Sequence, residues 1–167
     1  MKELINKRIE IAANIAIMVV AVIGGIVFAK NLWLHKTVDQ HELKMMMPVD
    51  YIDWSRSKKN LVLVLSTHCR FCSESAPFYR SLVDATKDNR GVRLIAVFPQ
   101  GVTEGKQYLK SMDIAIDEVL RKDLSKMAVQ ATPTLLLINE EGWIQNRWVG
   151  QLSQERETEV LKALNGG

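Results

Sequence analysis

The chain has 167 residues, of which 47% are hydrophobic and 25% charged, and its formal net charge is +3. These proportions are typical of a globular protein and exclude an extensively disordered one. The small net charge, without a basic stripe that alternates with aromatic residues, argues against a nucleic-acid partner. Two cysteines are too few for a disulfide-rich scaffold. The length allows one ordinary domain and an appendage.

The first predicted element is a membrane span. Residues 11–29 form a run of 19 residues without a charged side chain, in which Asn14 is the one strongly polar residue. As a helix with a rise of about 1.5 Å per residue, the run would extend about 28 Å, close to the hydrocarbon thickness of a bilayer. It is longer than the apolar region of a cleaved signal peptide, which favours an uncleaved anchor. We expect a cytoplasmic tail over 1–10, a transmembrane anchor over 11–34 and a connector over 35–47.

The orientation of this anchor is inferred from the charges that flank it. Basic residues occur in similar numbers on both sides: Lys2, Lys7 and Arg8 before the span, and Lys30, Lys36 and Lys44 after it. Those of the short N-terminal tail lie close to the span, which favours a cytoplasmic N-terminus. We therefore expect a single-pass protein of the cell (inner) membrane, with its remaining residues on the extracytoplasmic side.

The rest of the chain alternates predicted helices and strands, a pattern typical of the α/β class. Strands are predicted at 61–65, 93–98, 114–120, 135–138 and 143–149, and helices at 49–58, 72–87, 103–112, 124–129 and 153–164. Pro77 is expected to interrupt the second helix. Thr103 and Ser153 are the expected N-caps of the third and last helices. A turn at 139–142 with Gly142 predicts a hairpin between the last two strands.

Cys69 and Cys72 lie three residues apart at the junction between a strand and a helix. Their sulfurs can meet across one helical turn, as dithiol–disulfide chemistry requires. Unpaired backbone N–H groups and the helix dipole favour the thiolate of Cys69, and Arg70 and His68 are expected to add positive potential. We predict that Cys69 attacks a substrate disulfide and that Cys72 resolves the mixed disulfide. A structural disulfide is the alternative, but closing so short a loop would remove little entropy.

Other chemistries of paired cysteines lack their usual ligands. Haem attachment requires a histidine directly after the second cysteine, where Ser73 stands. Zinc and iron–sulfur sites require two more ligands, and the chain has no further cysteine. Copper binding stays open as a weaker alternative, through His68 with both thiolates or through the methionines at 45–47 with His35 and His41. We expect no metal and no cofactor other than a redox-active Cys69–Cys72 disulfide.

Three further features accompany the cysteine pair. Pro77 follows it, the sequence Ala131-Thr132-Pro133-Thr134 precedes a predicted strand, and the 139–142 hairpin is followed by a helix. Together with the cysteines, these features resemble the membrane-anchored thioredoxin-like proteins of bacteria, the TlpA and ResA type. The resemblance covers about residues 47–165. It implies a thioredoxin fold, a central mixed β-sheet flanked by helices, over residues 48–167.

The same resemblance implies a function and a second site element. The function is that of a thiol-disulfide oxidoreductase whose partners are the thiols and disulfides of extracytoplasmic proteins. The Thr132–Pro133 peptide bond is implied to be cis and to lie against the cysteines, where the Thr132 backbone can pair with an extended substrate. An ordinary trans proline that opens an edge strand is the alternative.

The chain also departs from the common family pattern. His68 replaces the usual tryptophan, and Arg70-Phe71 replaces Gly-Pro or a similar dipeptide. An added cation and the loss of the proline are expected to stabilise the thiolate, which makes the couple more oxidising and leaves the direction of the reaction open. Leu63 stands where thioredoxins carry a buried acid, so that Glu74 or solvent is expected to take the proton of Cys72.

A function of another class is an accessory or docking subunit of a membrane complex that uses the same fold. The long connector and two tryptophans expected at the surface, Trp143 and Trp148, motivate this alternative. The two functions do not exclude one another.

Overall fold

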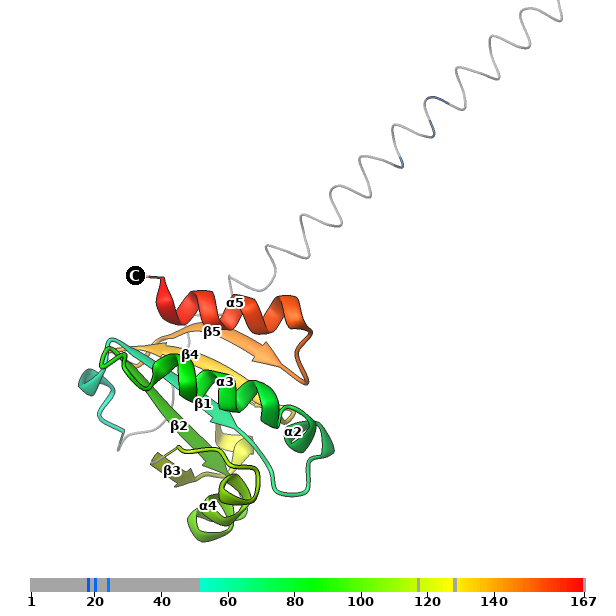
Figure 1. Cartoon of the computed structure of the whole chain (residues 1–167). Helices are drawn as coiled ribbons and strands as arrows, with labels where there is room; N and C mark the ends of the chain where they lie inside the picture. The colour runs from blue at the N-terminus through cyan, green and yellow to red at the C-terminus, as the bar shows by residue number, and fades with distance from the viewer. Residues whose placement is uncertain are drawn as a thin grey trace, which may run out of the picture. The chain divides into compact units, whose positions relative to one another are not determined.

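The computed structural model describes Met18, Val20 and Gly24 and residues 52–166 apart from 117 and 128 (Figure 1). Among these residues no helix has the length and apolar character needed to cross a bilayer. The predicted tail, the connector and all but three residues of the anchor lie outside the described residues. The chain divides into two units, Met1–Glu42 and Leu43–Gly167, and the elements below belong to the second.

A five-stranded mixed sheet forms the centre of this unit (Figure 1). Its strands are β1 (Lys59–Val64), β2 (Val92–Phe98), β3 (Glu118–Arg121), β4 (Thr134–Asn139) and β5 (Ile144–Val149). The strand order is β3-β2-β1-β4-β5, in which β1, β2 and β3 are parallel and β4 is antiparallel to β1 and β5. The central strand β1 is covered on both faces, and a strand in that position requires the continuous apolar run that predicted it.

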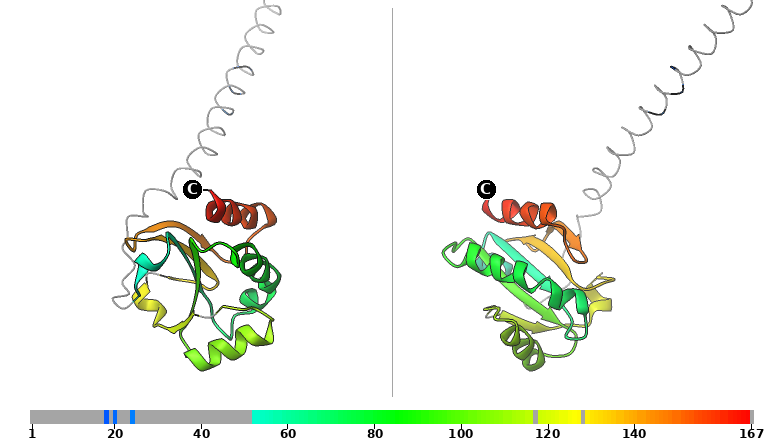
Figure 2. Two further views of the ribbon diagram at one scale, coloured as in Figure 1. Left: turned by 60° about the vertical axis from the view of Figure 1, so that its left-hand side comes forward. Right: turned by 45° about the vertical axis from the view of Figure 1, so that its right-hand side comes forward.

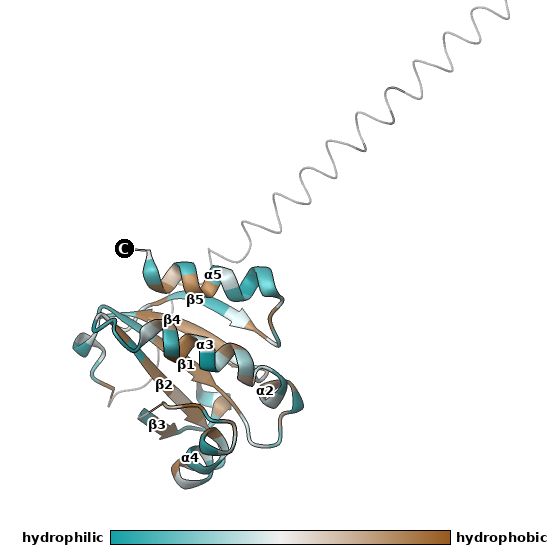
Figure 3. Ribbon diagram, viewed as in Figure 1, coloured by the Kyte–Doolittle hydropathy of each residue, from teal (hydrophilic) through white to brown (hydrophobic). Residues whose placement is uncertain are grey.

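Helices and turns cover the two faces of the sheet unequally (Figure 2). The elements are η1 (Trp54–Arg56), α2 (Arg70–Glu74), α3 (Ala76–Thr86), α4 (Val102–Ser111), η2 (Leu124–Met127) and α5 (Gln154–Asn165). All four helices contribute buried residues to one hydrophobic cluster, which we call the helix-side core. The 3-10 turns η1 and η2 cover the cluster on the opposite face. Figure 3 shows the most hydrophobic residues along the strands between these layers.

The predicted helix at 72–87 consists of two helices. The first ends at Glu74 and the second begins at Ala76, with Pro77 in its first turn. A proline is tolerated there because the first N–H groups of a helix have no intrahelical partner. The predicted interruption is therefore confirmed.

Several predicted boundaries and caps are wrong. The third helix begins at Val102, and Gly101 rather than Thr103 is its N-cap, because the Gly105 N–H already donates to the Gly101 carbonyl at 3.0 Å. Ser153, in contrast, is the N-cap of α5 as predicted, although its side chain makes no capping hydrogen bond. The predicted helix at 124–129 is a 3-10 turn, and the part of the predicted 49–58 helix that the structure describes contains only η1.

The expectation that Trp148 lies at the surface is also wrong. Trp148 is 1% exposed because it faces the helix-side core from β5, opposite Leu135 in register. Trp143 is 39% exposed, as expected. One of the two aromatic residues that motivated a docking role is thus part of the core.

Candidate functional site

The two cysteines lie where the parallel strands end. After β1 the chain passes through residues 65–68, and the Leu65 N–H donates to the Val97 carbonyl of β2 at 2.9 Å, which holds this loop against the sheet. Cys69 is the N-cap of α2 and has an extended backbone, with φ −94° and ψ 112°. Its Sγ accepts a hydrogen bond from the Cys72 N–H at 3.3 Å. Both cysteines are free thiols.

The two sulfurs differ in their surroundings. Cys69 is partly exposed and packs at the margin of the helix-side core, whereas Cys72 belongs to that core and is fully buried. Burial acts to raise the pKa of Cys69, but hydrogen bonds with Cys72, with the Thr132 side chain and with backbone N–H groups outweigh it, so the pKa of Cys69 is lowered. This is the direction that its place at the helix N-terminus predicted.

The pKa of Cys72 moves in the opposite direction. Burial, followed by the hydrogen bond with Cys69, raises it to about 12. Cys72 therefore carries its proton at neutral pH, while Cys69 is the more readily ionised sulfur. Because the thiolate is the nucleophile, this difference sets the order in which the two sulfurs can react.

The placement of Arg70 differs from the expectation that its charge acts on Cys69. The Arg70 side chain is 85% exposed and its Nε lies 2.6 Å from Oε1 of Glu74, one turn further along α2. The hydrogen bonds named above, and not this guanidinium, account for the lowered pKa of Cys69. Glu74 is also poorly placed to take the proton of Cys72, because residues two apart on a helix do not face each other.

His68 belongs to a small polar group beside Cys69. Its Nδ1 lies 3.3 Å from Thr67 Oγ1 and 3.3 Å from Gln100 Nε2, and Gln100 Nε2 also donates to Ser66 Oγ at 2.8 Å. Gln100 follows β2 and was missed by the sequence reasoning. The signal was available, because the carboxyl ends of neighbouring parallel strands meet at one edge of a sheet.

Thr132 and Pro133 approach the cysteines from the start of β4. The Thr132–Pro133 peptide bond is cis, as the family resemblance implied. The Cys69 thiol donates to the Thr132 carbonyl oxygen at 3.2 Å. The Pro133 carbonyl accepts from the Gly150 N–H at 2.8 Å, which ties the segment to the end of β5. Phe71, between the two cysteines, is 54% exposed. The structure thus brings all seven predicted site residues to one edge of the sheet.

Two tyrosines near the cysteines were not predicted. Tyr79 belongs to the helix-side core and Tyr108 packs against it. Both hydroxyl oxygens are buried without a hydrogen-bond partner among the described residues. Burial, and then the charge of Cys72, raise the pKa of Tyr108 to about 12 and that of Tyr79 still further.

The described residues of the site do not form a metal centre. Within residues 52–166, apart from the two positions that are not described, no three His, Cys, Asp or Glu side chains are grouped as metal ligands. The copper alternative built on the methionines at 45–47 lies outside the described residues.

Comparison with known proteins rests on structure, since no protein-family model matches the chain and no curated protein matches it in sequence. A thiol-disulfide isomerase from Corynebacterium glutamicum matches with a TM-score of 0.56 and 16% identity, over 75% of this chain and 93% of that one. StoA from Bacillus subtilis matches with a TM-score of 0.51 and 19% identity, over 69% and 93%. The chain has a thioredoxin-like fold.

A third structure agrees with this assignment. The thioredoxin domain of a thiol-disulfide oxidoreductase from Bacteroides vulgatus matches with a TM-score of 0.53 and 18% identity, over 66% of this chain and 81% of that one. The thioredoxin-like fold, with its central mixed sheet flanked by helices, is the part of the prediction that these similarities confirm.

Proposed function

We propose that the chain is a thiol-disulfide oxidoreductase that exchanges disulfides with protein substrates through Cys69 and Cys72. The observation that carries this proposal is the difference between the two sulfurs. One is partly exposed, caps a helix and has a lowered pKa, while the other is fully buried and holds its proton. An accessible thiolate beside a protected thiol is the arrangement that disulfide exchange needs.

The proposed reaction has two exchange steps. The Cys69 thiolate attacks one sulfur of a substrate disulfide, so that a Cys69–substrate disulfide forms and the other substrate sulfur leaves as a thiolate. Cys72 then loses its proton and attacks Cys69 Sγ, which forms the Cys69–Cys72 disulfide and releases the second substrate thiolate. Two electrons pass from the protein to the substrate, and the protons end on the released thiols. Run backwards, the same steps oxidise a substrate dithiol.

Whether the pair oxidises or reduces its substrate depends on the stability of the Cys69 thiolate. A lowered pKa at Cys69 stabilises the reduced form of the pair, and this makes the corresponding disulfide a stronger oxidant. We therefore place the couple on the oxidising side of a thioredoxin-type pair. The support for this placement is the hydrogen bonding of Cys69, since Arg70 is paired with Glu74.

We further propose that the domain works on the extracytoplasmic side of the membrane. The support is the apolar run at 11–29 with the charges that flank it. Protein disulfides also form and persist mainly in oxidising compartments. Protein thiols and disulfides of that compartment are the proposed partners.

The test combines an activity assay with a covalent trap. The full chain should catalyse insulin reduction by dithiothreitol or the oxidation of a reduced protein, and Cys69→Ala should lower both rates to the uncatalysed background. Cys72→Ser should accumulate a mixed disulfide with the substrate, visible on a non-reducing gel, because the resolving sulfur is absent. Full activity in the Cys69→Ala variant would contradict the proposal.

A further inference from the structure

The loop between β1 and α2 determines where Cys69 lies. Strand β1 ends at Val64 and α2 begins at Arg70, so residues 65–69 form a connection that is neither strand nor helix. Within this loop, the Cys69 N–H donates to the Ser66 carbonyl at 3.2 Å. If the proposed function holds, the loop has to keep Cys69 in place as the N-cap of α2 while a substrate disulfide approaches it.

The side chain of Gln100 joins this loop to the end of β2. Gln100 Nε2 donates to Ser66 Oγ at 2.8 Å and lies 3.3 Å from His68 Nδ1. Ser66 Oγ also accepts from the His68 N–H at 3.4 Å, so the three residues form one network. The amide of Gln100 thus contacts both polar side chains that lie on either side of Thr67 in the loop.

Gln100 is itself fixed by close packing at the end of β2. It lies between Phe98, the last residue of β2, and Val102, the first residue of α4. A Cβ at Gly105 would come within 2.5 Å of the Phe98 ring, and the absence of that atom lets the first turn of α4 lie directly against the strand. Tyr108 packs edge-on against the same ring, with centroids 5.8 Å apart. The turn that carries Gln100 is therefore held at both of its ends.

The two ends of the Gln100 amide differ in their hydrogen bonding. Nε2 bonds to the loop, whereas Oε1 is buried and has no hydrogen-bond partner among the described residues. A buried acceptor without a partner lowers stability, and its presence calls for a structural or functional reason. A methionine of similar length would fill the same space without that cost. The bonds that Nε2 makes to the loop are the contribution that favours a glutamine at this position.

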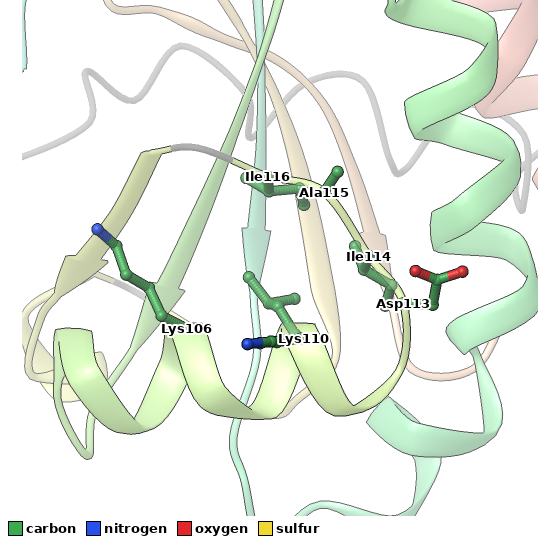
Figure 4. Close-up of a pocket in the computed structure, with 7 residues that line it drawn as sticks. Lys106, Lys110, Asp113, Ile114, Ala115 and Ile116 are labelled. Atoms are coloured by element: carbon green, nitrogen blue, oxygen red, sulfur yellow. The ribbon is translucent and has the colours of Figure 1, made fainter.

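The charged side chains of the neighbouring helices have other contacts. On α2, Arg70 pairs with Glu74, and the Arg70 side chain is 85% exposed. On α4, Lys106 and Lys110 line a pocket with residues 113–116 (Figure 4), and no residue of the loop belongs to that lining. In the described part of the chain, hydrogen bonds rather than ion pairs therefore connect the loop to β2.

We propose that Gln100 is a positioning residue of the redox site, whose amide holds the loop so that Cys69 stays at the N-terminus of α2. The connection runs from Gln100 Nε2 to Ser66, whose carbonyl accepts the Cys69 N–H. Burial acts to raise the pKa of Cys69, and hydrogen bonds such as that from the Cys72 N–H lower it. Because these bonds require Cys69 at the start of α2, a displaced loop would form the attacking thiolate only at a higher pH.

The test measures the alkylation of Cys69 by iodoacetamide as a function of pH in the full-length reduced chain. Gln100→Met keeps the length of the side chain and removes its hydrogen bonds. We expect the rate at pH of about 7 to fall about three- to fivefold, the factor by which losing one hydrogen bond shifts an equilibrium. The pH at which the rate levels off should rise by about half a unit. Gln107→Met replaces an exposed glutamine of α4 and is the matched control, which should change neither quantity.

A double-variant cycle separates this role from a general loss of stability. Ser66→Ala removes the acceptor of the 2.8 Å bond and should slow alkylation as much as Gln100→Met does. The double variant should be no slower than either single variant, because all three lack the same contact. An unchanged pH profile in Gln100→Met, or slowing in the double variant equal to the product of the two single effects, would contradict the proposal.

Two further outcomes are distinguished by the same variants. If urea denaturation shows that Gln100→Met does not fold, Ser66→Ala decides alone, and an unchanged pH profile in that variant would contradict the proposal. A wild-type chain without disulfide-exchange activity would overturn the proposed function instead. If the wild-type chain exchanges disulfides and Gln100→Met keeps the wild-type profile, only the positioning role of Gln100 is overturned.

Discussion

The polar groups at the two ends of the sheet differ in their hydrogen bonding. Where β1 and β2 begin, Lys59 Nζ donates to the carbonyls of Ala163, at 2.8 Å, and Leu164, at 3.2 Å, near the end of α5. At the same end, Arg93 pairs with Glu118, donating from Nε at 2.7 Å, and donates to the Asp53 carbonyl at 2.8 Å. Where these strands finish, both thiols are free, and the hydroxyls of Tyr79 and Tyr108 have no hydrogen-bond partner among the described residues.

This difference shows how the fold separates stability from chemistry. A charged side chain that donates to several backbone carbonyls fixes the positions of the helices and strands that carry them. Its N–H donors are then not available to a substrate. Buried polar groups without partners cost stability, and they are retained where a reaction can use them. The beginning of the parallel strands is thus the structural end of the sheet, and the cysteine edge is its chemical end. Two atoms, Asn60 Oδ1 and Arg147 Nε, depart from this division, since both are buried without a hydrogen-bond partner among the described residues.

The largest expected effect is on stability and comes from Arg93→Met. The Arg93 side chain is 13% exposed, and its loss leaves the Glu118 carboxylate, 28% exposed, without its partner. Removing one partner of a mostly buried pair should lower the free energy of unfolding by about 2–3 kcal/mol. Urea denaturation of the reduced chain measures this loss, and the rate at which iodoacetamide alkylates Cys69 should not change.

The double variant Arg93→Met/Glu118→Leu serves as the control. It removes both charges, so we expect it to recover a large part of the lost stability. If the single variant slowed the reaction of Cys69 while the double variant restored it, the two ends of the sheet would be coupled and the separation would not hold.

A second, smaller effect is expected for Lys59→Met. Its ammonium group donates to three carbonyls at the end of α5, those of Ala163, Leu164 and Gly166. The helix dipole also stabilises a positive charge at this end. We expect a loss of about 2 kcal/mol in the free energy of unfolding. Lys58→Met removes the neighbouring exposed lysine and should cost almost nothing. Equal losses in the two variants would show that net charge, and not this cap, is responsible.

The predictable part of the molecule is the part that local sequence controls. The apolar run of β1 and the spacing of Cys69 and Cys72 need no tertiary information, and the fold was inferred from the order of predicted helices and strands together with the family resemblance. Thr103 was a misleading cap signal because Gly101, at the end of the turn after β2, already starts the helix. Trp148 lies opposite Leu135 and faces the helix-side core, whereas Ile144 of the same strand joins the opposite cluster, because the pairing of β4 with β5 shifts register between Leu137 and Ile138.

The missing part of the site depends on tertiary packing. Gln100 reaches His68 only because β2 ends beside β1, and Tyr108 reaches the core only because Gly105 admits α4 close to Phe98. The ion pair of Arg70 is different. The i to i+4 spacing of Arg70 and Glu74 was visible in the sequence and would have indicated that the cation was already paired.

The third effect is on the pH dependence at the chemical end. The pKa of Cys69 is lowered in the folded chain, so its contribution to stability is fully present above the unfolded value of about 8.5 and is lost as the pH falls through the lowered pKa. The raised pKa of Cys72 acts oppositely. Its contribution is present below the unfolded value and is lost as the pH rises toward about 12.

Alkylation by iodoacetamide measures the first of these two shifts. The rate should rise about tenfold per pH unit and level off below pH of about 8.5, because the thiolate is the reacting species. A single cysteine should be modified in the folded chain, whereas both should react in urea with ordinary pKa values. The Cys69→Ala variant should stay unreactive up to pH of about 8.5. If the alkylation rate of the folded chain levelled off at the same pH as in urea, or at a higher pH, the result would contradict the lowered pKa of Cys69.

The smallest effect is expected where the sequence predicted a large one, at Arg70. Its guanidinium is 85% exposed and paired with Glu74, and an exposed pair one turn apart on a helix contributes about 0.3–0.5 kcal/mol. Arg70→Ala should therefore change the free energy of unfolding by about 0.5 kcal/mol or less and the alkylation rate of Cys69 at pH of about 7 by less than about twofold. Glu74→Gln is the matched variant, since it frees the guanidinium from its partner. If Arg70→Ala slowed alkylation several-fold and Glu74→Gln accelerated it, the cation would be acting on Cys69 after all, and the chemical end of the sheet would extend to its exposed charges.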